Sequence, residues 1–324
     1  MVKVLIFGTG GVGSVYGWIL DKGGAEVTVV CRSNFETVQR DGITIRSAIW
    51  GKVHYKPDTV NSVSAARGPF DYVLVCSKAF PGTSAHISDA VSPGTTIVLA
   101  QNGIGIEDEY AERFPGNPLV SGVVYLPVTQ VEPGVVVMGA AERFEIGSFP
   151  HDAPEPVKIK VQLLHDLWIG AGATCKVFDD IQAQRWTKLA LNASWNPMCA
   201  LTLCDDANLI RSSPEALDMV KKVMLEVGAV AAATGYPVVT EATIQGFLKM
   251  AQRRLDVGGN EPSMLNDARN QRALEVEAIL GNTVRIARRL NVATPTLDVL
   301  VCLARGLNYA ITKPAGWKPI ATVE

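Results

Sequence analysis

The chain has 324 residues and a mass of 34.7 kDa, which is enough for two domains that each bury a core. With 48% hydrophobic and 19% charged residues, its composition is that of a soluble globular enzyme. The net charge of −2 excludes a strongly basic surface for nucleic acid or anionic membranes, and no apolar run reaches the roughly 18 residues of a membrane span.

The first predicted element is a buried strand that leads directly into a glycine turn. An apolar run over residues 4–7 precedes the turn, and a helical apolar pattern over residues 14–20 follows it. In this arrangement Gly8 permits a tight turn, Gly10 lets the backbone approach a pyrophosphate, and Gly13 lets helix and strand pack closely. The pyrophosphate then lies on free N–H groups at the positive end of the helix. We therefore predict a dinucleotide site formed by Gly8, Thr9, Gly10, Gly11, Val12 and Gly13.

The second predicted strand, residues 27–30, is followed by Arg32 where an NAD site normally carries an acidic residue. An arginine at this point can pair with the 2′-phosphate of NADP in a charge-assisted contact. Ser33 and Asn34 offer further hydrogen bonds to the same phosphate. The alternative is an arginine that is simply solvated at the surface. The pattern favours NADP, used as NADPH.

Strands and helices alternate through the rest of the first half. Residues 42–46 and 52–56 predict a two-stranded insertion. Buried strands at 71–76 and 95–100 each end in a polar turn, and ligands of open α/β sheets bind at the carboxyl ends of strands. These turns, Ser77-Lys78-Ala79-Phe80 and Gln101-Asn102-Gly103-Ile104-Gly105, are therefore expected to face cofactor and substrate. Further strands are predicted near 119–126, 134–139 and 143–147.

From about residue 180 onward, apolar residues recur at helical spacing. Helices are predicted near 181–203, 213–234, 240–255, 265–290 and 295–307. Pro197 lies within the first of these helices and is expected to kink it, or else to break it. We predict an α/β Rossmann-type dinucleotide-binding domain over 1–180 and an all-α domain over 181–324. The first helix of the second domain is expected to form one wall of an interdomain cleft.

That helix carries Lys188, Asn192 and Asn196 at four-residue spacing, so the three side chains share one helical face. A solvated face is the alternative interpretation. Two neighbouring tryptophans and the scarcity of other charges instead favour a polar stripe on a partly buried helix. A lysine beside two amides in such a setting is suited to polarise a carbonyl and to hand over a proton.

Together these motifs resemble the ketopantoate reductases, which are NADPH-dependent 2-dehydropantoate 2-reductases, over nearly the whole chain. Residues 262–267 and 274–277 add to the resemblance, because they match a serine and a glutamate that the family places twelve residues apart. The resemblance implies a Rossmann domain followed by a helical domain like the C-terminal domain of 6-phosphogluconate dehydrogenase.

The resemblance also implies a role for each matching residue. Lys188 is the acid/base, and Glu275 contacts the substrate hydroxyl. The substrate-binding residues are Lys78, Asn102, Asn192, Asn196 and Ser263. Beside the glycine turn and Arg32, the cofactor contacts are Ser77, Lys78 and Asn102, of which the last two bridge cofactor and substrate.

Three departures from the family pattern leave the substrate open. Gln101 stands where the family often has histidine, and residues 274–277 read Leu-Glu-Val-Glu rather than Thr-Glu-Ile-Asp. The catalytic helix reads Asn-Ala-Ser-Trp-Asn-Pro from Asn192, a variant associated with divergent members. These changes keep the reduction chemistry and weaken the assignment of its substrate.

The leading hypothesis is reduction of a small 2-oxo acid, above all 2-dehydropantoate to pantoate in pantothenate biosynthesis. The alternatives are a related two-domain dehydrogenase for another hydroxy acid or a polyol phosphate, and an NADPH-binding sensor without catalysis. Retention of both Lys188 and Glu275 argues against a sensor. No metal is expected, because the four histidines and six cysteines lack metal-ligand spacing. Scattered cysteines and an N-terminal core strand without a signal peptide favour the cytoplasm, and a homodimer stays open.

Overall fold

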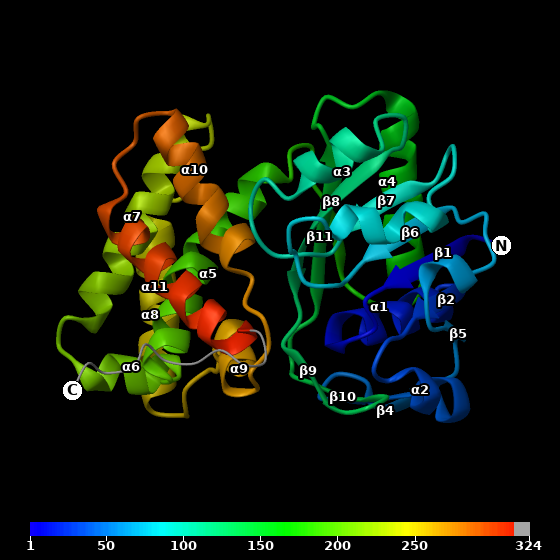
Figure 1. Cartoon of the computed structure of the whole chain (residues 1–324), viewed down its shortest axis with the longest axis horizontal. Coiled ribbons are helices and arrows are strands. Elements are labelled where there is room, and N and C mark those ends of the chain that lie inside the picture. Colours follow the sequence, from blue (N-terminus) through cyan, green and yellow to red (C-terminus); the bar gives the residue numbers. More distant parts are fainter. Residues whose placement is uncertain (314–324) are drawn as a thin grey trace, which may run out of the picture. The chain divides into compact units, whose positions relative to one another are not determined.

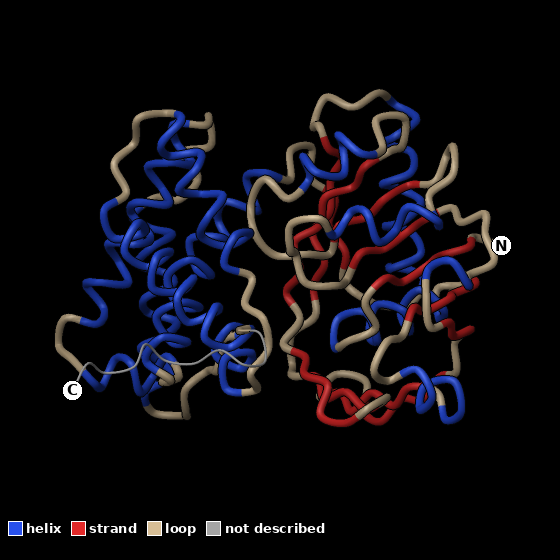
Figure 2. Tube along the Cα trace, viewed as in Figure 1, coloured by secondary structure: helices blue, strands red, loops and turns tan. Residues whose placement is uncertain are grey.

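The computed structural model describes residues 1–313, and the chain divides into two compact units, Met1–Arg185 and Trp186–Glu324. Within the described residues, strands occur only in the first unit and the second is built from helices (Figure 2). The division falls within the helix α5 (Gln182–Thr202), whose first four residues belong to the first unit. The expected domain bounds of 1–180 and 181–324 stay a prediction.

An eight-stranded sheet forms the centre of the first unit (Figure 1). In order across the sheet, its strands are β12 (Cys175–Val177), β11 (Arg143–Phe149), β8 (Leu119–Tyr125), β7 (Thr96–Leu99), β6 (Tyr72–Val75), β1 (Lys3–Phe7), β2 (Glu26–Val30) and β5 (Asp58–Val60). The strands from β8 to β5 are all parallel and have the order of a Rossmann fold, which confirms the predicted fold class. The strand order reverses between β1 and β6, so their carboxyl ends border the crevice that binds ligands in such sheets.

The apolar runs predicted as strands are covered on both faces, as parallel strands require. Val4, Leu5 and Ile6 of β1 are fully buried. The helices and 3₁₀ turns of this unit are α1 (Gly11–Lys22), α2 (Phe35–Asp41), η1 (Val63–Ala65), η2 (Thr83–Ala90), α3 (Glu107–Arg113) and α4 (Glu155–Gly170). Tyr16 of α1 lies 4.9 Å, between ring centroids, from Trp168 of α4, and this contact fixes α1 against α4. The sequence did not predict α4, β5 or β12.

A second, four-stranded sheet contains the predicted insertion. Its order is β4 (Gly51–Tyr55), β3 (Ile43–Ser47), β10 (Val135–Met138) and β9 (Val128–Glu132). The antiparallel pair β3–β4 confirms the two-stranded prediction. The insertion is larger than predicted, because β10 pairs with β3 and the unpredicted β9 pairs with β10.

In the second unit, α7 packs against four other helices. The helices are α5, α6 (Asp206–Ser212), α7 (Ala216–Ala233), α8 (Glu241–Gln252), η3 (Arg253–Leu255), α9 (Ser263–Arg269), the π-turn η4 (Glu277–Gly281), α10 (Asn282–Arg289) and α11 (Pro295–Thr312). Val220, Val223, Val227 and Val230 of α7 are fully buried at helical spacing and form the core. Pro197 lies inside α5 without ending it, which excludes the alternative of a helix break.

The predicted helix over 265–290 is wrong, because the chain leaves helical geometry between α9 and η4. Gln271 adopts a left-handed conformation with φ of 52°. The backbone N–H of Leu274 donates to Oδ1 of Asn308 on α11 at 2.8 Å, instead of to a carbonyl of its own helix. This tertiary contact holds the residues before Glu275 outside a helix.

Candidate functional site

The glycine turn between β1 and α1 has the geometry that the fingerprint requires. Gly8 has φ of +98°, and a Cβ there would lie 2.4 Å from the backbone nitrogen of Ser77. A Cβ on Gly13 would lie 2.3 Å from the carbonyl oxygen of Gly8, which shows how closely helix and strand pack. Beside Gly10, in contrast, no heavy atom lies within 4 Å of the Cβ position. The turn therefore leaves open space at Gly10, where a pyrophosphate needs it, and fits a dinucleotide.

Gly13→Ala is expected to lower the free energy of unfolding by about 1–3 kcal/mol, because the added methyl group meets a backbone oxygen that cannot move aside cheaply. Gly10→Ala is the matched control, since its φ is negative and no heavy atom lies within 4 Å of its Cβ position. Urea unfolding of both variants measures the difference. Equal losses of stability would contradict the close-packing role of Gly13.

The end of β2 is tied to this turn. The hydroxyl of Thr9 donates to the carbonyl of Val30 at 2.8 Å. The buried Asn34 donates from Nδ2 to the carbonyl of Thr9 at 2.9 Å, so Asn34 holds the turn rather than facing a phosphate as expected. Arg32 is exposed, and its side chain makes no hydrogen bond or ion pair with other groups in residues 1–313. The guanidinium is therefore not engaged by another group of residues 1–313.

The polar turns after β6 and β7 are joined by Gln101. Its Nε2 donates to the carbonyl of Ser77 at 3.0 Å, and its Oε1 accepts a hydrogen bond from the hydroxyl of Tyr110 at 3.2 Å. This buried amide thus links the turn that carries Lys78 to the turn that carries Asn102, both of which are half-buried. Oγ of Ser77 is buried and has no hydrogen-bond partner among the described residues, so it can serve a bound group. The glycine turn therefore contacts the segment after β2 and the turn after β6, which Gln101 joins to the turn after β7. Their contacts with a cofactor stay a prediction.

Helix α5 carries the polar stripe. Lys188 and Asn192 are half-buried, and Asn196 is only 5% exposed. The stripe continues to Asn196 because the helix continues through Pro197. It is therefore not a solvated face, and its side chains lie in the partly desolvated setting that the sequence predicted.

Ser263 and Glu275 lie on other elements of the second unit. Ser263 is the exposed first residue of α9, and Glu275 is 6% exposed in the segment between α9 and η4. Two residues further on, Glu277 accepts hydrogen bonds from Arg285 and Arg305. The hydrogen bond from Arg305 is the main reason that the pKa of the Glu277 carboxyl is lowered. The position of Ser263 and Glu275 beside the α5 stripe stays a prediction.

The sequence did not single out Arg185 and Glu107, which form a buried ion pair in the first unit with Nε and Oε1 2.7 Å apart. No sequence signal marked them, because an arginine after Gln-Ala-Gln and a glutamate beside two other acids both resemble solvated residues.

Comparison with known proteins decides the family. A family model described as ketopantoate reductase PanE/ApbA matches residues 4–151, and the model of its C-terminal part matches residues 180–308. The chain belongs to the ketopantoate reductase family. Membership supports an oxidoreductase that acts on 2-oxo acids.

Solved and curated relatives of this ketopantoate reductase family member cover nearly its whole length. The crystal structure of 2-dehydropantoate 2-reductase from Methylococcus capsulatus is 34% identical, with a TM-score of 0.84 over 97% of this chain and 99% of that one. The 2-dehydropantoate 2-reductase of Mesorhizobium japonicum is 26% identical over 94% of this chain and 98% of its own. D-mandelate dehydrogenase with NADH and anilino(oxo)acetate is 22% identical, with a TM-score of 0.83 over 96% and 99%, and shows the fold alone.

Within residues 1–313, no three or more His, Cys, Asp or Glu side chains are grouped so that they could hold a metal ion. In the same range, no helix combines the length and the apolar composition needed to cross a bilayer.

Proposed function

We propose that the protein reduces a small 2-oxo acid with NADPH, and that 2-dehydropantoate is its first candidate substrate. The observation that carries the proposal is the stripe of Lys188, Asn192 and Asn196 on α5, in a chain of this family that also has a dinucleotide turn. A binding protein without catalysis needs only the glycine turn and Arg32. The hypothesis of such a protein therefore does not explain a half-buried lysine on α5.

The first unit supplies groups that fit NADPH. The open space at Gly10 and the N–H groups that begin α1 suit the pyrophosphate, and the exposed Arg32 suits the 2′-phosphate. The unpaired hydroxyl of Ser77 and the side chains of Lys78 and Asn102 complete the proposed contacts. When bound, NADPH supplies the hydride that reduces the ketone carbon.

The second unit supplies the polar groups for the 2-oxo acid. Lys188 donates a hydrogen bond, and then a proton, to the ketone oxygen as negative charge develops there. Asn192, Asn196 and Ser263 bind the substrate, and Glu275 accepts a hydrogen bond from its hydroxyl. The half-buried setting of Lys188 and Asn192 strengthens their contacts, because water competes with them less than at an exposed surface.

Oxidation of NADPH, followed by absorbance across a panel of 2-oxo acids, tests this proposal. The panel contains 2-dehydropantoate, smaller aliphatic 2-oxo acids and the aromatic 2-oxo acid that corresponds to mandelate. We expect the highest kcat/KM with 2-dehydropantoate. A preference for another member would change the substrate. Reduction of NADP⁺ by a hydroxy acid or a polyol phosphate, without turnover of any 2-oxo acid, would favour a related dehydrogenase. NADPH binding without turnover of any compound would favour the sensor.

Arg32→Ala is expected to weaken NADPH binding by about 1.5–3 kcal/mol, which is the usual contribution of a hydrogen bond to a charged group. NADH lacks the 2′-phosphate, so its affinity should hardly change. Fluorescence titration of both cofactors into wild type and variant measures the difference. Arg40 is a matched control, because it is equally exposed but pairs with Asp41 through its own ion pair. Equal losses for NADPH and NADH would show that Arg32 does not read the phosphate.

A further inference from the structure

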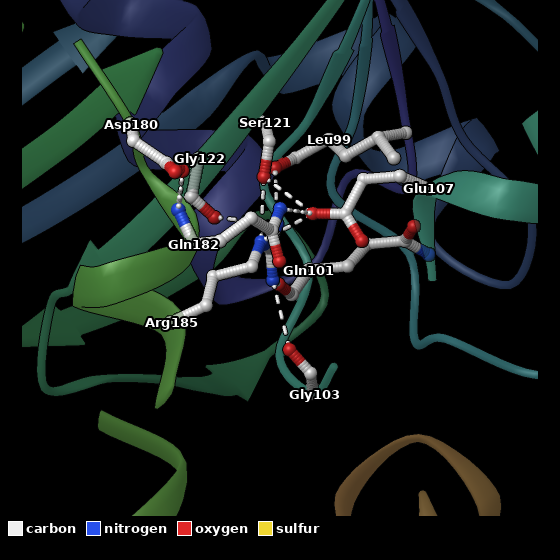
Figure 3. Close-up of polar contacts among 9 residues, drawn as sticks. All are labelled: Leu99, Gln101, Gly103, Glu107, Ser121, Gly122, Asp180, Gln182 and Arg185. Carbon is white, nitrogen blue, oxygen red and sulfur yellow. Dashed lines mark hydrogen bonds and ion pairs between the residues drawn. The ribbon is translucent and has the colours of Figure 1, made fainter. Parts of the chain in front are cut away.

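A buried cluster at the start of α5 is built around Arg185, which is 3% exposed (Figure 3). Its partner Glu107 is fully buried at the first residue of α3. Oε1 of Glu107 also accepts hydrogen bonds from Ser121 at 2.6 Å and from Gln182 at 2.8 Å. The carboxylate thus fixes the guanidinium from one side and the first turn of α5 from the other.

The remaining donors of Arg185 point at backbone carbonyls. Nη1 donates to the carbonyls of Gln101 and Gly103, each at 3.0 Å, and Nη2 donates to the carbonyl of Gly122 at 3.0 Å. Gln101 and Gly103 are the two neighbours of Asn102 in the chain. A single planar guanidinium therefore holds the carbonyl groups of both chain neighbours of Asn102, as Figure 3 shows.

Two glycines give the Asn102 turn its shape. Gly103 and Gly105 have positive φ of 107° and 63°, so the backbone bends sharply and its carbonyls cannot join the sheet. Buried carbonyls need a partner, and here Arg185 supplies it. A lysine could not do the same, because one ammonium lacks the fixed fork of donors.

Stability alone does not explain a charge in this place. A buried ion pair gains little over a well-packed apolar pair, because desolvation of both charges offsets their attraction. What the guanidinium adds is direction, since it fixes the positions of several carbonyls at once. The residue so oriented is Asn102, and Lys188 follows Arg185 by three residues in the same helix.

We propose that Arg185 is a positioning residue that acts through Asn102, with Glu107 holding its guanidinium in place. This inference takes one element from the proposed function, namely the contact between Asn102 and NADPH. Arg185 is not itself proposed to contact cofactor or substrate. It sets the place of a side chain that does.

A double-mutant cycle of Arg185→Lys and Asn102→Ala tests the proposal, with NADPH affinity measured by fluorescence titration. Arg185→Lys alone is expected to weaken NADPH binding at least tenfold. In the Asn102→Ala background the same substitution is expected to change the affinity less than twofold. Amide hydrogen exchange in residues 101–105 should also accelerate in Arg185→Lys. Gln182→Ala is the matched control, because it removes a hydrogen bond to Glu107 and leaves the carbonyl contacts intact.

If Arg185→Lys does not fold, Glu107→Gln takes its place in the cycle, since it keeps the shape and one acceptor oxygen. The expected result is the same coupling with a smaller single effect. Losses that stay equally large in the Asn102→Ala background overturn the proposal, as does a lower melting temperature with unchanged NADPH affinity. Failure of the wild type to reduce any 2-oxo acid would overturn the proposed function instead, and the binding cycle would still decide the role of Arg185.

Discussion

Lys188→Ala is expected to lower kcat by about 100- to 1,000-fold, the usual loss when one preorganised donor to a developing oxyanion is removed. The physical reason is that negative charge on the ketone oxygen exists only in the transition state, so the lost contact appears in kcat. NADPH affinity should stay within about twofold, because Lys188 lies on α5 and not in the glycine turn. Steady-state kinetics with 2-dehydropantoate and a separate NADPH titration measure both quantities.

Two further variants separate the functions of this site. Lys188→Arg keeps the positive charge but cannot release a proton near neutral pH, so it should recover part of the charge stabilisation and little of the proton transfer. Glu275→Ala removes a contact that already exists in the ground state, and it should raise KM more than it lowers kcat. A Lys188→Ala variant with wild-type kcat would exclude Lys188 as the acid, whatever the other two variants do.

The sequence predicted the parallel sheet well, because a fully buried strand is a short apolar run and glycine turns mark its end. It missed α4 for a specific reason. Only Val161, Leu164 and Trp168 of α4 are buried, and exposed apolar residues such as Ile159 and Leu163 blur the helical period. Because apolar residues also occur on the exposed face of α4, its hydrophobic residues show no clear helical periodicity. The sequence pattern alone therefore could not predict this helix.

The break before Glu275 could not be read from the sequence either. Apolar residues keep helical spacing across it, so the pattern predicts one helix over 265–290. The break depends on Asn308, which captures the N–H of Leu274 from another helix. Tertiary contacts of this kind override local propensity. Glu275, a predicted site residue, lies in the non-helical segment that the break creates. Departures from local sequence rules are common at functional sites.

At the candidate site, the sequence predicted the groups that a ligand would meet and missed those that hold them. Gly8, Gly10 and Gly13 follow from spacing, because their roles depend on adjacent residues of the chain. The pairing of Glu107 with Arg185 joins distant segments, and each residue alone fits a solvated position. Only the fold shows that the two are buried together.

Glu107→Ala is expected to lower the free energy of unfolding by about 3–5 kcal/mol, because it leaves the Arg185 charge buried without its carboxylate. Burial already lowers the pKa of the Arg185 guanidinium, and the Glu107 carboxylate is the charge that opposes this shift. Urea unfolding followed by circular dichroism measures the loss. Glu112→Ala on the same helix is the control, since Glu112 is exposed and should change stability by no more than about 0.5 kcal/mol.

The double variant Glu107→Leu with Arg185→Met asks whether the pair serves stability or geometry. Removing both charges together avoids an unpaired one, so much of the stability lost in Glu107→Ala should return. The carbonyls of Gln101 and Gly103 would still lack their donor, and NADPH affinity should stay low. A double variant that regains both stability and affinity would mean that Arg185 only fills space. If Arg185 instead serves to position the Asn102 turn, the double variant should regain stability but not NADPH affinity.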